Sequence, residues 1–379
     1  MLRLYAIQAR YGDCLLLEFG TAAEPHYVLI DGGPRRTYEN YLRAELERIG
    51  GHLDLIVLSH VDNDHVVGLL DLTSELREQR ANGEAETAQI DALWHNAFDD
   101  TIGKGTNIEA RFVSALAVAS QATMSLTSTG IALQGIGEGR QLRRDAALLG
   151  IPVNDGFPGG FVCVDTAPPA IELGPLCLRV VGPTEANLQE LRAEWEDWLD
   201  KHADDLATGD PMVMAMADRS VPNLSSIMLL AEVEGKTILL TGDGRGDYLL
   251  QGLDEAGLLD ENGGLHVDVL KVAHHGSDRN VTRRFFRRVT ADHYVCSADG
   301  LHGNPDLATL IWIVEGACED GRPIEILLTN QTSSTEKLLE EYPPEKYGYR
   351  LTILDPDASA LTLELVPAEE KEEANLERE

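Results

Sequence analysis

The sequence predicts an α/β protein in which strands occur in both halves of the chain and helices lie between them. Apolar segments bounded by turn residues begin at residue 2 and return after residue 224. Helical spacing of apolar residues separates them, most clearly at 38–50 and 185–202. The chain has 379 residues, of which 43% are hydrophobic, enough for a sizeable core. We therefore expect a single domain over residues 1–365.

The N-terminal part is predicted to contain a run of strands, one helix and then a further strand. Turn signals at Gly12-Asp13 and Asp31-Gly32-Gly33 separate the first apolar segments. The helical spacing at 38–50 stops at Gly50-Gly51, and a second helix should open at 66–72. In chain order, the strands are predicted at 2–8, 14–19, 27–30 and 55–58.

Residues 98–222 differ in composition and are interpreted as an inserted, mostly helical region. Helices are predicted there at 108–124 and 185–202. The apolar stripe of the second helix is interpreted as core packing and consists of Leu188, Leu191, Trp195 and either Trp198 or Leu199. Strand signals return at 226–230, 237–243, 267–272, 293–297 and 325–328. The acidic tail 366–379 is predicted to be disordered.

The charge of the chain restricts its partners. Its 64 acidic and 31 basic residues give a formal net charge of -33, which argues against binding extended duplex nucleic acid or an anionic membrane by bulk attraction. A small or short anionic substrate remains compatible, and the acidic surface or the 98–222 region can dock a protein partner. The five cysteines form no Cys-x-x-Cys pair, and the N-terminus has no apolar signal segment. We expect a cytoplasmic protein.

The strand at 55–58 runs into four potential metal ligands within six residues: His60, Asp62, Asp64 and His65. Imidazole and carboxylate groups together suit a hydrolytic first-row cation, and the end of a strand holds side chains rigidly. The alternative is a solvated loop with these residues by chance. Four ligand-type residues after such an apolar strand favour the metal site.

Three later segments also place a ligand-type residue after an apolar strand. Asp243 follows the strand that ends at Thr241-Gly242, and its carboxylate can bridge two metals. His274 and His275 follow the strand at 267–272. His302 lies in the loop after the strand at 293–297 and, taken alone, is equally compatible with an ordinary loop histidine.

Five arginines crowd the segment after His275, at positions 279, 283, 284, 287 and 288. Their spacing places two i, i+4 pairs along one side of a helix. The simpler interpretation is a solvated helix face that pairs with surface carboxylates. The sharper one is a phosphate or nucleotide clamp, for which guanidinium geometry is well suited, with Arg279 and Arg283 as candidate substrate ligands.

Taken together, these motifs resemble the metallo-β-lactamase fold hydrolases, and within them the branch that includes the hydrolase-like domain of bacterial competence (DNA uptake) proteins. Residues 59–65 resemble the motif Ser-His-x-Asp-x-Asp-His, and 239–243 resemble Leu-Leu-Thr-Gly-Asp. Residues 270–277 resemble Leu-Lys-Val-x-His-His-Gly-Ser. The likeness spans roughly residues 1–330 and is weakest over 98–222. It implies an αββα sandwich, two mixed sheets flanked by helices, with the helical insertion over the active site.

The resemblance also implies a ligand set. His60 and Asp62 would bind one metal, Asp64 and His65 a second, and Asp243 would bridge them. Asp62 stands where the family has histidine, which favours manganese or iron at the first site. The third histidine of the family has no match, and Asn223 is the nearest polar candidate. For the last ligand, the choice among the later histidines stays open: His274 is favoured, with His275 and His302 as ligands or proton shuttles.

The implied activity is metal-dependent hydrolysis with one or two ions of Zn²⁺ or Mn²⁺, iron being possible. A metal-activated water would attack a phosphoester, such as a nucleotide or short nucleic acid. Asp64 or Asp62 would orient the water or accept its proton, and one of the later histidines would protonate the leaving group. The alternatives are a lactone, amide or thioester hydrolase of the same fold, or a partner-dependent protein with a partly degenerate metal site.

Overall fold

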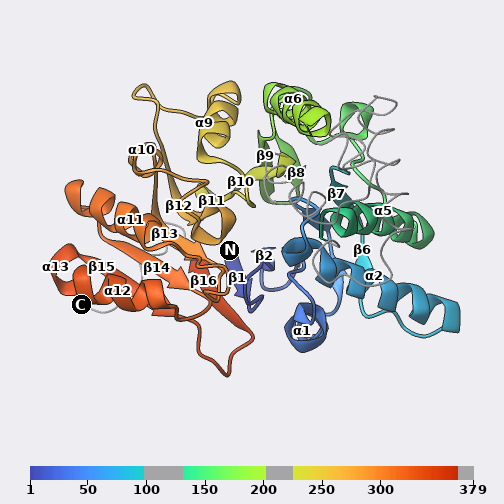
Figure 1. The fold of residues 1–379 in the computed structure, drawn as a ribbon. Helices are drawn as coiled ribbons and strands as arrows, with labels where there is room; N and C mark the ends of the chain where they lie inside the picture. Colours follow the sequence, from blue (N-terminus) through green and yellow to red (C-terminus); the bar gives the residue numbers. More distant parts are fainter. Residues whose placement is uncertain (98–130, 202–224, 366–379) are drawn as a thin grey trace.

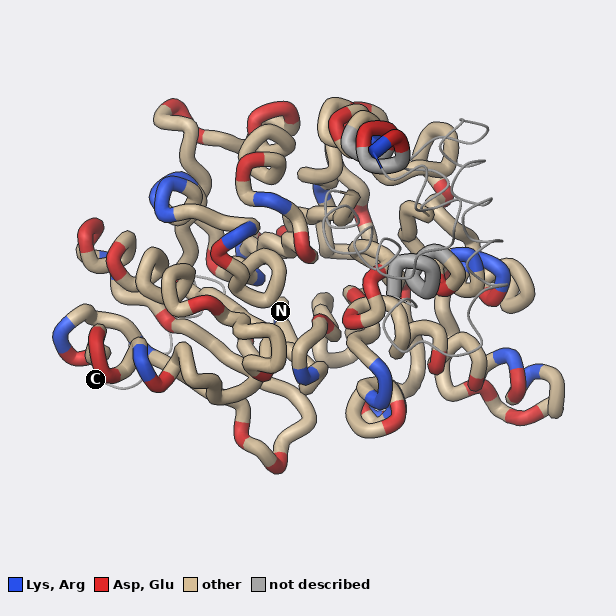
Figure 2. Tube along the Cα trace, in the orientation of Figure 1, with Lys and Arg blue, Asp and Glu red and all other residues tan. Residues whose placement is uncertain are grey.

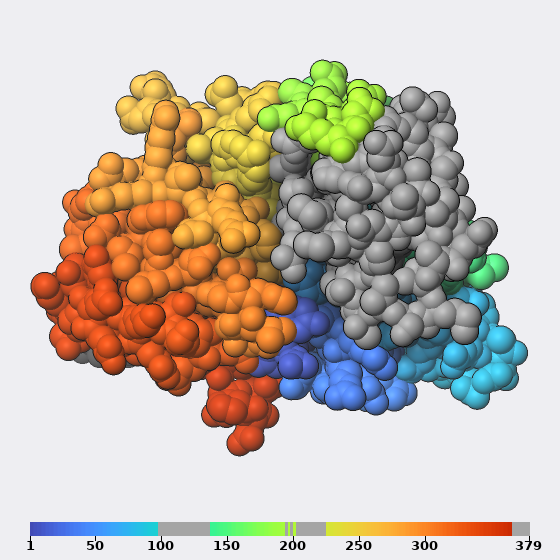
Figure 3. All heavy atoms as spheres, in the orientation of Figure 1, coloured from blue at the N-terminus to red at the C-terminus, as the bar shows by residue number. Residues whose placement is uncertain are grey.

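A computed structural model of the chain describes residues 1–97, 131–201 and 225–365. Two mixed β-sheets pack face to face, and helices cover their outer surfaces (Figure 1). In the space-filling view, the N-terminal segments, in blue, and the C-terminal segments, in orange and red, meet near the middle of the face shown (Figure 3). The αββα sandwich expected from the sequence is confirmed.

The first sheet combines an antiparallel half with a parallel half. Its order is β16-β1-β2-β3-β5-β7, antiparallel from β16 to β3 and parallel from β3 to β7. The last strand pairs with the first, so the segment at 360–365 lies beside the N-terminus. The strands are β1 (Leu2–Ile7), β2 (Leu15–Gly20), β3 (Pro25–Ile30), β5 (Leu55–Leu58), β7 (Leu93–His95) and β16 (Ala360–Leu365), and a separate short pair is formed by β4 (His52–Leu53) and β6 (Gln89–Ile90).

The second sheet runs in the order β15-β14-β13-β12-β11-β10-β9-β8. Strands β11 to β15 are parallel, and β8 to β11 are antiparallel. The strands are β8 (Ile171–Leu173), β9 (Leu176–Gly182), β10 (Met228–Val233), β11 (Lys236–Leu240), β12 (Leu265–Lys271), β13 (Val289–Cys296), β14 (Ile324–Leu328) and β15 (Tyr349–Ile353).

Alternation along the strands builds the layers. In β2, Leu15 and Leu17 belong to the core between the two sheets, whereas Leu16 belongs to the core under the helices of the first sheet. Successive side chains of a strand point to opposite faces, so a strand buried on both faces is apolar throughout. In β11, Ile238 and Leu240 face the first sheet and Leu239 faces the opposite way. The predicted strands are continuous apolar runs for this reason.

The outer helices fall into two groups. The first sheet is covered by η1 (Tyr38–Leu42), α1 (Arg43–Arg48), α2 (Asn63–Asn82) and α5 (Ile131–Leu149). The second is covered by α9 (Gly246–Glu255), α10 (Arg283–Arg288), α11 (Leu307–Glu319), α12 (Ser333–Glu341) and α13 (Pro344–Tyr347). The 3-10 segments η2 (Pro158–Gly160) and η4 (Ala273–Gly276) lie in connections, and α6 (Glu185–Lys201) follows β9. None of these described helices has both the length and the apolar character needed to span a bilayer.

The range 98–222, predicted to be an inserted and mostly helical region, contains strands as well as helices. Strands β8 and β9 lie within it and extend the second sheet beyond β10. Helix α5 packs along α2 and joins the core of the first sheet through Leu142 and Ala146. The predicted helix at 185–202 is α6, in which Leu188 and Leu191 are buried. Residues 98–130, which include the predicted helix at 108–124, lie outside the described residues, as do residues 202–224 and the tail 366–379.

Candidate metal centre

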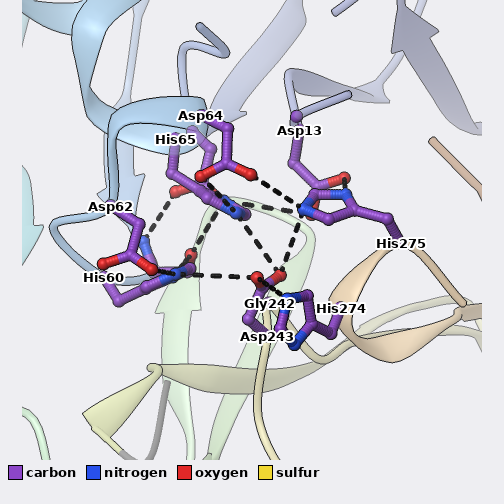
Figure 4. A network of polar contacts seen from close by, with 12 residues as sticks. Asp13, His60, Asp62, Asp64, His65, Gly242, Asp243, His274 and His275 are labelled. Atoms are coloured by element: carbon purple, nitrogen blue, oxygen red, sulfur yellow. Dashed lines mark hydrogen bonds and ion pairs between the residues drawn. The ribbon is translucent and has the colours of Figure 1, made fainter. Parts of the chain in front are cut away.

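The candidate site lies at the carboxyl ends of β5, β11 and β12, where the two sheets meet (Figure 4). The loop after β5 and the first turn of α2 carry His60, Asp62, Asp64 and His65. The turn after β11 carries Asp243, and η4 after β12 carries His274 and His275. The carboxyl ends of parallel strands are the usual location of ligand sites in α/β sheets. Here that location brings distant segments of the chain together.

The carboxylate of Asp243 lies at the centre and faces different histidines with its two oxygens (Figure 4). Its Oδ1 lies 3.3 Å from His65 Nε2 and 3.6 Å from His275 Nε2. Its Oδ2 lies 3.5 Å from His274 Nε2 and 3.7 Å from His60 Nε2. One carboxylate thus serves two neighbouring sets of nitrogen atoms, the arrangement expected of a ligand shared by two metal ions.

Three further carboxylates complete the two sets. Asp64 Oδ2 lies 3.3 Å from His275 Nε2, and Asp13 Oδ1 lies 3.3 Å from the Nδ1 atom of the same ring. On the other side, Asp62 Oδ2 lies 3.5 Å from His60 Nε2. Asp62 and Asp64 keep 26% and 22% of their side-chain exposure, whereas Asp13 keeps 1%. The solvent side of the site is therefore formed by Asp62 and Asp64, together with His274, whose side chain is 30% exposed.

The outer nitrogen of each of three histidine rings is held by a separate partner. His65 Nδ1 lies 2.8 Å from Asp31 Oδ2, and Asp31 Oδ1 also accepts the backbone N–H of Ser59 at 2.7 Å. His275 Nδ1 donates to the carbonyl oxygen of Ser297 at 2.9 Å. His274 Nδ1 lies 2.8 Å from Asn280 Oδ1. Such partners fix the tautomer and orient Nε2 towards a metal.

Glycines allow the loops of the site to approach one another. A Cβ on Gly12 would lie 2.0 Å from the carbonyl oxygen of Asp64, a separation that no side chain can tolerate. The adjacent backbone N–H of Asp13 donates to that same oxygen at 3.2 Å. Gly242 has a φ of +48°, and a Cβ there would lie 2.9 Å from Cβ of Ser59. The close approaches at Gly12 and Gly242 place Asp13 and Asp243 beside the metal-ligand candidates carried by α2.

A buried lysine lies directly behind the ligands. The ammonium of Lys271, at the end of β12, contacts the carboxylate of Asp13, and both side chains are 1% exposed. It also donates to the carbonyl oxygen of Gly242 at 3.1 Å. Burial alone would raise the pKa of Asp13, but Lys271 and then His275 lower it to about 2. Asp13 is therefore ionised and available as an acceptor.

The carboxylates favour positive charge within the site. Burial opposes protonation of His275, yet Asp243 and Asp13 raise its pKa to about 10. Burial also opposes protonation of His65, yet Asp243 and Asp31 raise its pKa well above the ordinary value. A bound metal ion can supply this positive charge in place of protons, because metal and protons compete for the same nitrogen atoms.

Several ligand-type atoms are left without a protein partner. Within the described part of the chain, Nε2 of His60, His65 and His275 and Oδ1 of Asp243 are buried and have no hydrogen-bond partner. Buried polar atoms without partners are unfavourable unless an ion or water satisfies them. Asp13, His65, Asp243 and His275 each offer an atom within 4.8 Å of the others. The residues present thus fit a metal ion with nitrogen and oxygen ligands.

The structure brings together the seven metal-ligand candidates named from the sequence, counting His275. His302 is exposed and contacts Tyr11 edge to face at a centroid distance of 5.3 Å, outside this cluster. Asn223 lies outside the described residues. Arg279 lines a neighbouring pocket. Arg283 was predicted as a substrate ligand, but its guanidinium is instead paired with Glu315 at 3.1 Å and Glu319 at 2.7 Å on α11.

Sequence reasoning missed Asp13 and Lys271. Asp13 lies in a short turn between two strands, where Gly-Asp is common. Lys271 is the last residue of an otherwise apolar buried strand. A lysine in such a position, and an acidic residue after a glycine at a strand end, are the signals that point to them.

The sequence matches no protein-family model and no curated protein. Among solved structures, it is similar to "a New Diphosphatase from the PhnP Family", with 13% identity, a TM-score of 0.39, and coverage of 97% of this chain and 99% of that one. A mutant metallo-beta-lactamase from Cronobacter sakazakii has 11% identity and a TM-score of 0.29, over 84% and 91% of the two chains. The metallo-beta-lactamase SMB-1, bound to 2-mercaptoethanesulfonate, has 12% identity and a TM-score of 0.28, over 83% and 92%. These likenesses are remote, and the architecture rests on the sheets and layers of this chain.

Proposed function

We propose that the protein is a metal-dependent hydrolase that acts on phosphoesters. The observation that carries this proposal is the convergence of four histidines on the two oxygens of Asp243. A purely structural network would not leave buried Nε2 atoms without a hydrogen bond around a shared carboxylate. A site built to hold cations at the end of parallel strands is the arrangement of a hydrolytic centre.

The two faces of Asp243 define two proposed ligand sets. The first consists of His60, Asp62 and His274, and the second consists of Asp13, Asp64, His65 and His275, with Asp243 common to both. The mixture of imidazole and carboxylate ligands suits Zn²⁺ or Mn²⁺, with iron as a further candidate. When bound, the metal would polarise the scissile oxygen and lower the pKa of water.

The chain itself supplies positioning and proton transfer. We assign Asp64 the role of orienting the attacking water and accepting its proton, because its carboxylate is partly exposed and lies 3.3 Å from His275 Nε2. His275 is then a ligand, not the acid, since its Nδ1 is tied to the Ser297 carbonyl. His302 is the proposed proton donor to the leaving group. It contacts Tyr11, whose pKa is raised by burial and by Asp64.

The charged side chains in and beside the metal centre favour a phosphoester over a lactam or thioester as the substrate. The carboxylate-rich ligand set suits hard cations, which bind phosphoryl oxygens. Asn280, which holds His274, also lines a pocket with several arginines. Guanidinium groups bind phosphate in bidentate fashion. Cytoplasmic location and partner binding through the acidic surface stay as proposals beside this activity.

The test uses the full chain after chelation and reconstitution with Mn²⁺ or Zn²⁺. We expect hydrolysis of bis-p-nitrophenyl phosphate and none of nitrocefin. D243N should abolish the activity and lower the metal content measured by mass spectrometry, whereas D320N, an exposed aspartate on the far end of α11, should change neither. Hydrolysis of nitrocefin alone would show a lactamase. Less than one ion per chain, with no stability lost on chelation, would show a non-enzymatic role.

A further inference from the structure

A cavity of about 700 Å³ lies between α9 and the segment that leads into α10. This volume is within the range of small-ligand sites. Its wall includes Arg245, Arg279, Arg284 and Arg288, together with Asp247 and Asp254. Four arginines therefore face two aspartates in a protein whose net charge is -33. Figure 2 shows the basic segment of α10 in blue, at the position that Figure 1 labels.

The cavity is joined to the candidate metal centre through Asn280. Its side chain contacts His274 Nδ1 at 2.8 Å and donates to the backbone carbonyl of Asp243 at 2.8 Å. Its own carbonyl accepts the backbone N–H of Gly246, the first residue of α9, at 2.7 Å. The same residue thus lies behind the ligands and lines the cavity. The cavity therefore adjoins the outer side of the His274 ring.

The arginines that line the cavity differ in their ion-pair and hydrogen-bond partners. Arg245 is paired with Asp247 at 2.5 Å, and Arg288 Nε donates to the Gly263 carbonyl at 2.6 Å. Arg279 and Arg284 have no carboxylate within 4.0 Å among the described residues. Both are exposed guanidinium groups. Because Arg279 and Arg284 both line the cavity without a carboxylate partner, their N–H groups can donate to a bound anion.

Other arginines of the same helix provide the contrast. Arg287 is paired with Glu319 at 2.8 Å, and Arg283 is paired with the same carboxylate. Both therefore point toward α11 and away from the cavity, and neither belongs to its wall. The basic segment noticed in the sequence is thus divided between a surface ion-pair face and a cavity face.

We propose that this cavity is a subsite for a phosphate group other than the one that is cleaved, held by Arg279 and Arg284. The inference rests on the proposed phosphoesterase function, because it names the substrate class of that site: a short phosphodiester that also carries a terminal phosphate monoester. A dianionic monoester matches two guanidinium forks better than a singly charged diester does. The negative charge of the rest of the protein repels long polyanions. The arginines of the cavity therefore favour the binding of a short anion only.

The first test measures binding without catalysis. Inorganic phosphate is titrated into the chelator-treated full chain, and binding is followed by the rise in Tm. R279A/R284A should weaken phosphate binding by at least about tenfold, the loss expected for charge-assisted hydrogen bonds. R287A removes one positive charge from α10 outside the cavity wall and should leave binding unchanged. R279K/R284K keeps the charge and should bind with intermediate affinity.

The second test compares pTpT with TpT as substrates of the metal-loaded enzyme. Wild type and R287A should show a KM for pTpT at least about tenfold lower than for TpT, and R279A/R284A should lose this difference. Equal phosphate binding by R279A/R284A and wild type would overturn the subsite, whatever the activity. Binding without a preference for pTpT would overturn the substrate class. Absence of all hydrolysis contradicts the proposed function, while the phosphate titration still decides the subsite.

Discussion

The ammonium of Lys271 and the carboxylate of Asp13 form a contact between two side chains that are each only 1% exposed. Lys271 ends β12 of the second sheet, and Asp13 lies in the connection between β1 and β2 of the first. The pair therefore links the two sheets directly behind the proposed ligands. Lys271 is buried, and its raised pKa shows that the attraction of Asp13 and Asp243 prevails over burial.

Replacing Lys271 by methionine should destabilise the fold strongly. K271M keeps most of the side-chain volume but leaves Asp13 buried and uncompensated, which costs about 3–5 kcal/mol. Urea unfolding in the presence of chelator measures the free energy of unfolding. D13N/K271M removes both charges and should recover much of the loss. If K271M and the double variant are equally stable, the contact is not an essential charge pair.

Asp31 should act on metal affinity through the His65 ring. It accepts hydrogen bonds from Ser59 and holds His65 Nδ1 at 2.8 Å. D31A frees the ring to rotate or change tautomer, and we expect metal affinity to fall by about 10–100-fold. Competition with a fluorescent chelator measures this. D54A breaks a similar contact, His26 Nδ1 to Asp54 at 2.7 Å, away from the metal centre, and should leave the affinity unchanged.

The sequence predicted the parts of the site that are local and missed those that depend on long-range packing. Each predicted ligand stands just after an apolar strand, and parallel strands bring such ends to one edge of a sheet. Asp13 acquires its role only because Gly12 lets its loop approach Asp64, a contact made by residues far apart in the chain. Lys271 is similar, because its partner belongs to the other sheet.

The same distinction explains the corrections. Spacing placed Arg283 and Arg287 on one side of a helix, and they do share Glu319. The spacing could not show that this side faces α11, since that depends on how two helices pack over the sheet. Likewise, β8 has only three residues, and β10, which pairs with β9, begins only at Met228, so composition alone did not show that the sheet continues there.

Gly12 should tolerate no side chain. In G12A the new Cβ would meet the Asp64 carbonyl oxygen at 2.0 Å, and backbone on both sides must move. We expect a loss of about 2–4 kcal/mol in the free energy of unfolding and weaker metal binding, because Asp13 and Asp64 are displaced together. G137A in α5 is the matched control, since nothing lies within 4 Å of its Cβ position. It should be neutral or slightly stabilising. Unaltered stability of G12A would show that this loop is loosely packed.

His95, the last residue of β7, should make stability depend on pH in the acid range. The ring is fully buried, and its nitrogen atoms have no hydrogen-bond partner among the described residues. Burial, and then the nearby Arg143, lower its pKa from 6.5 to about 3. Between these values the unfolded chain takes up a proton that the folded protein refuses, so stability falls as pH decreases from 6.5 towards 3.

H95L removes this proton uptake. The difference in unfolding free energy between wild type and H95L, measured by urea titration with chelator present, should therefore shift against wild type by about 2–3 kcal/mol between pH 7 and pH 4.5. All other titrating groups are common to the two proteins and cancel in the difference. Parallel pH profiles for wild type and H95L would mean that His95 is protonated inside the fold.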